Sequence, residues 1–162
     1  MGDRYDFELT ANLREEVPEH VLQMLSFLLC PGGEAPTQVP DHPFFGPGWM
    51  RDPFINWASS CDPHMGDTAC SFRRVLRYTR HDVDHYQFTL HLRFAAKAET
   101  VFEVGLLFAT WVAVWSDQNE FVGYFKGEHA IHPTLLYFHD QELYAREVTE
   151  RPQRATDGAL WD

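Results

Sequence analysis

The sequence predicts an α+β fold in which two helices cover one face of an antiparallel sheet. Apolar and polar residues alternate in 5–13 and again in 86–94, which is the period of half-buried strands. In 21–29 and 104–115 the apolar residues recur at spacings of three and four, which is typical of amphipathic helices. With 162 residues, of which 44% are hydrophobic, the chain is long enough to bury a core of its own.

The first strand is expected over residues 5–13. Its odd-numbered side chains are all apolar and would face the core, whereas Asp6, Glu8, Thr10 and Asn12 would face the other side. Proline at position 18 suits the first turn of the helix that follows, and the Pro-Gly-Gly sequence at 31–33 ends that helix.

Residues 72–78 and 86–94 predict a central hairpin that turns at 81–84. Gln87 belongs to the polar set of the second strand, so it is expected on the open face of the sheet. Matching the apolar faces of the two strands predicts the cross-strand pairs Phe72–Leu92 and Leu76–Phe88.

Residues 99–115 fit either a fully buried strand or a helix, and their length favours a helix after a short extended start. A strand over 121–126 follows, and 134–139 with 142–147 predict a closing hairpin. The order strand, helix, strand, strand, helix, strand is that of a ferredoxin-like βαββαβ fold, here followed by a C-terminal hairpin. That order describes architecture alone and implies no chemistry.

A single α+β domain is expected over residues 1–149. Within it, residues 30–69 form a long insertion that is rich in aromatic residues and proline, with an apolar spacing that fits neither a helix nor a strand. The polar segment 150–162 is expected to be a flexible tail.

The charge of the chain limits its partners. It has 24 acidic and 13 basic residues, which gives a net charge of −11. Nucleic acids and anionic membranes repel a field of this sign, so neither is an expected partner. A basic protein surface is favoured, and self-association is the alternative. With no visible signal peptide, no apolar run of membrane length and only three cysteines, a soluble cytoplasmic protein is expected.

Two hypotheses account for the aromatic side chains of residues 41–67. The first holds that they complete the core, because clustered aromatic residues are most often buried together. The second holds that they wall a pocket or an interaction surface, because long irregular loops are often functional. The candidate binding residues are Phe44, Phe45, Trp49 and Trp57.

Two groups contain residue types that bind metals. Cys61, His64 and Cys70 could bind zinc with a fourth ligand such as His42, although the usual paired spacing is missing from the sequence. The turn at 81–85 holds two histidines and two aspartates. Exposed or packed loop residues are the more common explanation of both groups, so no metal and no other cofactor is expected.

The candidate catalytic residues are His91, Glu8, Arg73 and Arg93, all on the polar face of the predicted sheet. A carboxylate could orient the imidazole for acid–base catalysis, and the arginines could hold an anionic substrate. The alternative is a solvated ladder of charges on an exposed face, where ion pairs contribute little. The sequence contains no motif of a serine hydrolase, a phosphate-binding loop or a zinc protease.

The leading hypothesis is a small, non-enzymatic binding protein, such as an acidic inhibitor or immunity-type protein for a basic partner. The alternative is a small enzyme or ligand-binding protein with a pocket between residues 41–67 and the sheet, in which His91 and Glu8 form the acid–base pair. A deep pocket that converges on His91 or His64 would favour the alternative. A flat acidic or aromatic surface would favour the binding protein.

Overall fold

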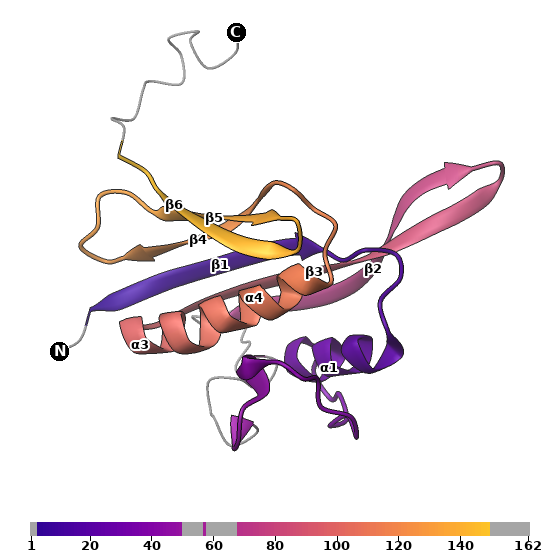
Figure 1. Ribbon diagram of the computed structural model, residues 1–162, viewed down its shortest axis with the longest axis horizontal. Coiled ribbons are helices and arrows are strands. Elements are labelled where there is room, and N and C mark those ends of the chain that lie inside the picture. The colour runs from indigo at the N-terminus through magenta and orange to yellow at the C-terminus, as the bar shows by residue number, and fades with distance from the viewer. Residues whose placement is uncertain (1–2, 50–56, 58–67, 150–162) are drawn as a thin grey trace, which may run out of the picture.

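Strands and helices follow one another along the chain in the predicted order. Figure 1 shows the computed structural model, of which residues 3–49, 57 and 68–149 are described. The strands are β1 (Arg4–Asn12), β2 (Ala69–Arg80), β3 (Val83–Lys97), β4 (Phe121–Gly127), β5 (Thr134–His139) and β6 (Glu142–Glu147). The helices are α1 (Glu19–Leu29), α3 (Ala98–Thr100) and α4 (Leu106–Val114), with a 3₁₀-helix at Pro43–Phe45 and a π-helix at Val101–Gly105.

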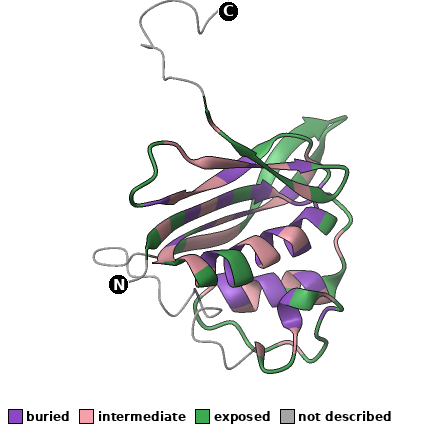
Figure 2. Ribbon diagram, turned by 60° about the vertical axis from the view of Figure 1, so that its left-hand side comes forward, coloured by how far each residue is buried: buried purple, intermediate pink, exposed green. Residues whose placement is uncertain are grey.

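All six strands form one antiparallel sheet in the order β2-β3-β1-β4-β5-β6. Helix α1 and the helical run that ends with α4 lie together on one side of this sheet (Figure 2). The predicted α+β class, with an antiparallel sheet and two main helices, is confirmed. The sheet has two strands more than the four of a ferredoxin-like fold, because the C-terminal hairpin joins the β4 edge.

The face of the sheet that meets the helices is the core face. In β1 the side chains of Phe7, Leu9 and Ala11 are completely buried, as the alternation of the sequence predicts. Helix α1 presents its apolar stripe to the same core. The buried residues of α1 are Val21, Met24, Leu25, Leu28 and Leu29.

The helical run is continuous from residue 98 to residue 114, so the expected extended start is wrong. The run packs closely on the sheet at Gly105. A Cβ atom at this position would lie 3.0 Å from the ring of Phe94 and 3.2 Å from that of Phe7. A glycine therefore lets the π-helix approach the sheet.

The register of the β2–β3 hairpin differs from the predicted one by two residues. Phe72 lies opposite Leu90 and Leu76 opposite Tyr86, with a bulge between Leu76 and Tyr78. An offset of two leaves every side chain on its predicted face, so matching of the apolar faces could not distinguish the two registers.

Gln87 is buried, and the prediction that it lies on an exposed face is wrong. Its side-chain nitrogen donates a hydrogen bond of 2.8 Å to the carbonyl of Leu13. Leu13 in turn donates its backbone N–H to the carbonyl of Phe88 at 2.9 Å. The chain therefore continues past the end of β1 over β3 and covers Gln87. Phe88 is only half-buried and stacks on Phe72, with ring centres 5.1 Å apart.

Both hairpins turn on two residues with positive φ. His81 and Asp82 join β2 to β3 with φ of 50° and 61°, and Asp140 and Gln141 join β5 to β6 with φ of 47° and 65°. Positive φ at both central positions gives a turn whose twist matches the strands, even without the usual glycine. The closing hairpin has the bounds that the sequence predicts.

The far part of the β2–β3 hairpin projects beyond the rest of the sheet (Figure 1). Strand β1 ends at Asn12, opposite Thr89. Past this point β2 and β3 pair with each other, and every residue from Arg73 to Arg80 is exposed. We call residues 74–86 the β2–β3 arm.

The aromatic segment extends the core on the helix side. Phe44, Phe45 and Trp57 are only 5%, 8% and 3% exposed. The rings of Phe44 and Trp57 lie 5.4 and 4.8 Å from that of Phe108, and Phe45 lies 4.7 Å from Trp111. These contacts favour the hypothesis that the segment completes the core.

Candidate binding surface on the open face of the sheet

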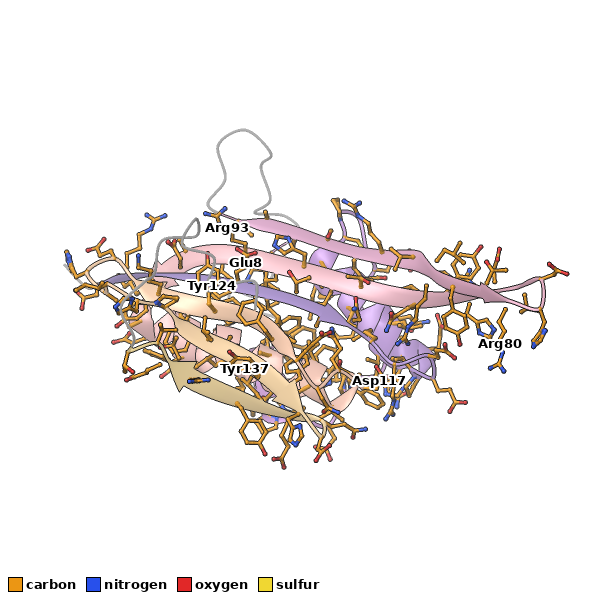
Figure 3. The ribbon with its side chains drawn as sticks, turned by 90° about the horizontal axis from the view of Figure 1, so that it is seen from above. Glu8, Arg80, Arg93, Asp117, Tyr124 and Tyr137 are labelled. Carbon is orange, nitrogen blue, oxygen red and sulfur yellow. The ribbon has the colours of Figure 1, made fainter. Side chains whose placement is uncertain are left out.

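The face of the sheet opposite the helices is open in the described part of the chain. Arg93, Glu8 and Tyr124 lie directly opposite one another on β3, β1 and β4. Leu135 and Arg146 continue this row across β5 and β6. Figure 3 looks onto this face and shows Glu8, Arg93 and Tyr124 close together. Four of the five side chains in the row are polar, so the face can make directional contacts.

Glu8 is the centre of the polar cluster. Its carboxylate lies 3.6 Å from Nε2 of His91, and each of the two side chains is about one-third exposed, at 33% and 35%. Tyr124 lies directly opposite Glu8 on the neighbouring strand, beside the same carboxylate. Partial burial and the negative charge of Glu8 raise the pKa of Tyr124, while the positive charge of Arg93 opposes that rise. The tyrosine hydroxyl therefore remains a donor at neutral pH.

The structure brings three of the four candidate catalytic residues together but does not enclose them. Four pockets of the described part have volumes from about 240 to 750 Å³, and neither Glu8 nor His91 lines any of them. Arg73 lies opposite Thr89, one row away from His91, and is exposed. A carboxylate–imidazole pair with this exposure can exchange protons with water. The described residues do not enclose it with walls that would orient a small substrate.

A shallow hollow of about 390 Å³ lies on the open face over β5 and β6. Tyr137 and Tyr144 lie opposite each other, and the ring of Tyr137 is 5.9 Å from that of Phe121. Tyr144 donates its hydroxyl to Glu142 at 3.1 Å. This hydrogen bond and the negative charge of Glu142 raise the pKa of Tyr144. The residues that line the hollow are Tyr137, His139, Tyr144, Ala145 and Arg146.

Sequence reasoning missed this hollow. The hairpin itself was predictable, and its two-residue turn fixes which side chains face each other. The signal that could have found the hollow is therefore the Tyr137–Tyr144 pair, which the turn at Asp140 and Gln141 places on one face. Tyrosine and arginine on a flat surface are types that anchor protein interfaces.

The predicted binding residues of the aromatic segment lie on the other side of the sheet. Phe44, Phe45 and Trp57 are part of the core, and Trp49 is half-buried with its ring 5.2 Å from that of Phe45 and 6.2 Å from that of Phe27. None of the four lies on the open face. Their role in binding stays a prediction.

The predicted zinc ligands are described only in part. Cys61 and His64 lie outside the described residues. His42 Nδ1 accepts the backbone N–H of Phe44 at 3.1 Å, which caps the 3₁₀-helix. Partial burial lowers the pKa of His42 from its ordinary value of 6.5, and Asp41 opposes this effect. The Sγ atom of Cys70 lies 3.5 Å from the carbonyl of Leu29. His42 therefore has a structural role at Nδ1.

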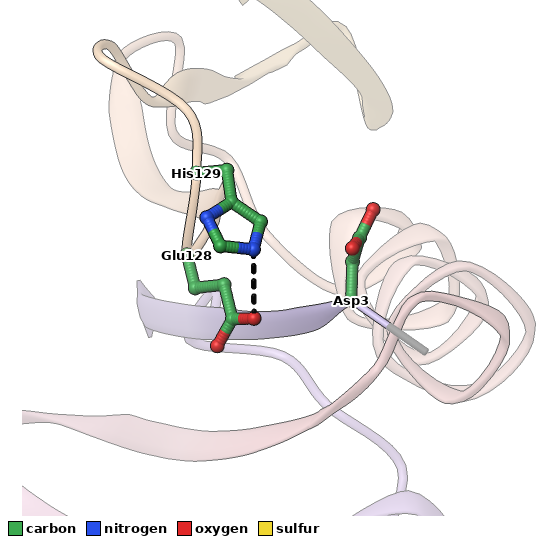
Figure 4. Close-up of side chains that lie close together, drawn as sticks. All are labelled: Asp3, Glu128 and His129. Carbon is green, nitrogen blue, oxygen red and sulfur yellow. Dashed lines mark ion pairs between the residues drawn. The ribbon is translucent and has the colours of Figure 1, made fainter. Parts of the chain in front are cut away.

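Another cluster of potential metal ligands occurs at the opposite end of the sheet from the arm. Asp3, Glu128 and His129 have one ligand atom each within 4.8 Å of one another, and all three are exposed (Figure 4). Nε2 of His129 lies 3.1 Å from Glu128. Among the described residues no other group of three such side chains meets this limit, so the residues of the 81–85 turn do not converge. Exposed acidic groups are common without an ion, and an ion pair accounts for this cluster.

The largest of the four pockets lies on the helix side and has a volume of about 750 Å³. Its aromatic wall is formed by Tyr5, Phe102 and Phe125, whose ring centres are 5.3 to 6.5 Å apart. Phe102 belongs to the π-helix. No residue of 41–67 that the structure describes lines this pocket. Residues 43–49 border a smaller pocket of about 240 Å³, which they form with the helical run at Glu103, Val104 and Leu107 and not with the sheet. A pocket between residues 41–67 and the sheet stays a prediction.

The chain matches no family model, and comparison with curated proteins and with solved structures found no match. No helix in the described part of the chain has the length and apolar character needed to cross a membrane. Functional conclusions therefore depend on the geometry of the surface itself.

Proposed function

We propose that this is a non-enzymatic binding protein that recognises another protein through the open face of its sheet. The single observation that carries the proposal is the row of polar side chains that Arg93, Glu8 and Tyr124 form across the open face, of which none lines any of the four pockets described above. Enzymes that act on small molecules enclose them in clefts, whereas protein interfaces are broad and mostly flat.

The residue types on the open face support a protein partner. Tyr137, Tyr144 and Arg146 line a hollow that could accept a side chain of the partner. Next to it, Arg93 and Tyr124 flank the carboxylate of Glu8 and could form directional hydrogen bonds at the rim. Anchors in a central hollow with a polar rim are typical of interface hot spots.

The charge of the chain supports a basic partner. The net charge is −11. Asp117, Glu120, Asp140 and Glu142 are exposed near one end of the open face. A field of this sign accelerates the encounter with a basic protein and disfavours acidic ones. We include a cytoplasmic location in the proposal, because three cysteines without a CxxC pair do not form the disulfide framework typical of oxidising compartments.

Affinity capture from an extract of the source organism with three baits tests the proposal. The baits are the wild type, a Tyr137→Ala/Arg146→Glu variant of the open face, and a Lys97→Glu control at the far end of β3. We expect the wild type and the control to retain the same basic protein, and the open-face variant to retain about tenfold less of it. Identical retention by all three baits would refute the open face as the binding surface.

A second candidate function is the binding of a small apolar ligand in the 750 Å³ pocket. The aromatic wall of Tyr5, Phe102 and Phe125 favours it, as does the position of Phe102 in a π-helix, a feature that is frequent at functional sites. Phe102→Ala should abolish any stabilisation by an apolar ligand in thermal unfolding, whereas the Tyr137→Ala/Arg146→Glu variant should retain it.

We also propose that β1 to β4 with α1 and α4 form a ferredoxin-like unit that the C-terminal hairpin extends. The support is the order β2-β3-β1-β4 with β1 antiparallel to both neighbours. This arrangement leaves one sheet face free of helices, which is what the proposed binding surface requires.

A further inference from the structure

The β2 strand has a charge opposite to that of the rest of the chain. It contains four arginines and no acidic residue, which gives it a charge of +4 in a chain of −11. The arginines are Arg73, Arg74, Arg77 and Arg80, and all of them are exposed. The remainder of the chain therefore carries −15, of which −2 comes from Asp82 and Asp84 in the same hairpin. Residues 74–86 hold three arginines and these two aspartates, a net charge of +1, so the positive charge is concentrated along the β2 edge of the hairpin.

The β2–β3 arm also exposes several large apolar side chains, which is unusual for a hairpin surrounded by solvent. Of the eleven large apolar side chains that are exposed in the described part, five lie in the arm, and the most exposed are Leu76 and Val83 at 54% and 57%. Arginines alone would protect an edge strand from unwanted pairing. Arginines together with this much apolar surface are typical of a contact surface. The five are Val75, Leu76, Tyr78, Val83 and Tyr86.

The body carries an acidic surface at the same end as the arm but at the opposite edge of the sheet. Asp117 and Glu120 precede β4, and Asp140 and Glu142 lie at the turn between β5 and β6. The two segments are joined by hydrogen bonds from Phe138 N to the carbonyl of Glu120 and from Asp140 N to the side chain of Asn119. We call these four carboxylates the acidic end.

The positions of the two surfaces fit a symmetric dimer. Figure 3 shows Arg80 near the tip of the arm, farther along the sheet than Asp117. The arm belongs to the β2 edge of the sheet, whereas the acidic end lies toward the β6 edge. A two-fold axis perpendicular to the sheet places the two molecules end to end. It also brings the β2 edge of each molecule to the same side as the β6 edge of the other. The arm of each copy then runs alongside the acidic end of the other, so that both complementary contacts form at once.

We propose that the protein self-associates into a two-fold dimer in which the β2–β3 arm of each copy, with its arginines, docks on the acidic end of the other. Charge complementarity within one chain selects this occupant over a nucleic acid, which the −15 of the chain outside β2 would repel. Val114 and Phe121, which are both exposed, flank the acidic end and give the apolar residues of the arm a contact. The contact borders the open face at Glu142, which accepts the hydroxyl of Tyr144, and leaves the row of Glu8, Arg93 and Tyr124 accessible.

Sedimentation equilibrium of two charge-reversed variants tests the dimer. One variant carries Arg77→Glu and Arg80→Glu in the arm, and the other carries Asp140→Lys and Glu142→Lys at the acidic end. Each change lies on exposed positions, and circular dichroism verifies that both variants fold. A Lys97→Glu/Lys126→Glu variant is the control, because it changes an equal number of charges away from both surfaces.

We expect the wild type and the control to dimerise at low salt and to dissociate as salt rises. Each reversed variant alone should weaken self-association by about tenfold or more, because like charges then meet across both contacts. An equimolar mixture of the two variants should form a heterodimer, since the acidic arm of one then faces the basic end of the other. A wild type that stays monomeric at low salt, or a mixture that does not associate, would overturn the proposal. If the protein stays monomeric and binds an acidic peptide or duplex DNA through the arm, the arm has another partner. That result would also overturn the proposal.

Discussion

The two faces of the sheet are made from the same strands and obey opposite constraints. In β1 the side chains of Phe7 and Leu9 are completely buried against the helices. Their neighbour Glu8 is one-third exposed on the other face, where it contacts His91 and Tyr124. Because a core is close-packed and an open face is solvated, changes on the first affect folding and changes on the second affect recognition. Stability and binding should therefore be separable by substitution.

Truncation of the core aromatic residues should cause the largest loss of stability. Trp57→Ala removes a ring that packs on Phe94 and Phe108, and Phe44→Ala removes a ring that packs on Phe108 and Trp111. Each change should lower the free energy of unfolding by about 3–5 kcal/mol. Denaturant unfolding measures the loss. Tyr137→Ala on the open face is the control and should cost about 1 kcal/mol or less. Unchanged unfolding midpoints for the two core variants would show that the aromatic segment serves a pocket or interface instead of the core.

Substitution of Gly123 should be an exception, because it should affect stability and binding together. This residue lies beside β1, and an added Cβ would lie 1.9 Å from the carbonyl oxygen of Glu8, where only backbone movement can relieve the clash. Gly123→Ala should cost about 2–3 kcal/mol and also displace Glu8 from Tyr124, so both folding and binding suffer. Gly127→Ala is the matched control, because its Cβ would meet the ring of Tyr5 at 3.2 Å, and a side chain can move. Equal unfolding midpoints for the two variants would contradict the close approach of β4 to β1.

Gln87 and Phe88 sharpen the comparison, because at these two positions the burial of the two faces is no longer opposite. Gln87 on the open face is buried, and Phe88 on the core face is only half-buried. Gln87→Ala leaves the carbonyl of Leu13 without its donor and should cost about 1–2 kcal/mol. Phe88→Ala removes a half-buried ring stacked on Phe72 and should cost a similar amount. Thermal unfolding of both variants measures the ratio. A loss several times larger for Phe88 would support the strict alternation that the sequence alone predicts.

The elements of the fold were predictable because their signals are local. The two short runs on either side of Asp140 and Gln141 and the spacing in 21–29 predict β5, β6 and α1 correctly. The register of β2 on β3 was not predictable, because a shift of two preserves both faces. The burial of Gln87 depends on where the chain runs after β1, which is a tertiary effect.

The candidate site was predictable only as a set of residues. Strand parity places Glu8, His91 and Arg93 on one face, and they are together in the structure. The absence of walls around them, within the described part of the chain, could not be derived from parity. Tyr124 joined the cluster through a pairing of β1 with β4 that no local pattern specifies.

The pH dependence of stability tests whether His42, which is partly buried on the helix side of the sheet, contributes to folding. Burial lowers the pKa of His42 in the folded state, so the unfolded chain binds the proton more tightly. Stability should therefore be complete above the ordinary pKa of 6.5 and should fall as the pH drops below it. His42→Asn retains an acceptor for Phe44 N and removes the titration. Denaturant midpoints at about pH 7 and pH 5.5 should differ less for this variant than for the wild type, and an identical difference would show that His42 does not contribute.

The ion pair of Glu8 and His91 should have the smallest effect, and its size reports how open the face is. Both side chains are about one-third exposed, so water and salt screen their attraction. A double-mutant cycle with Glu8→Gln and His91→Asn should give a coupling of about 0.5 kcal/mol or less, which decreases further at high salt. In the same variants the affinity for a protein partner should fall more than the stability, because the partner excludes water from the pair. A coupling above about 2 kcal/mol in the free protein would mean that the pair is already shielded from solvent. The face would then be a covered site, and the difference between the two faces of the sheet would be one of polarity and not of exposure.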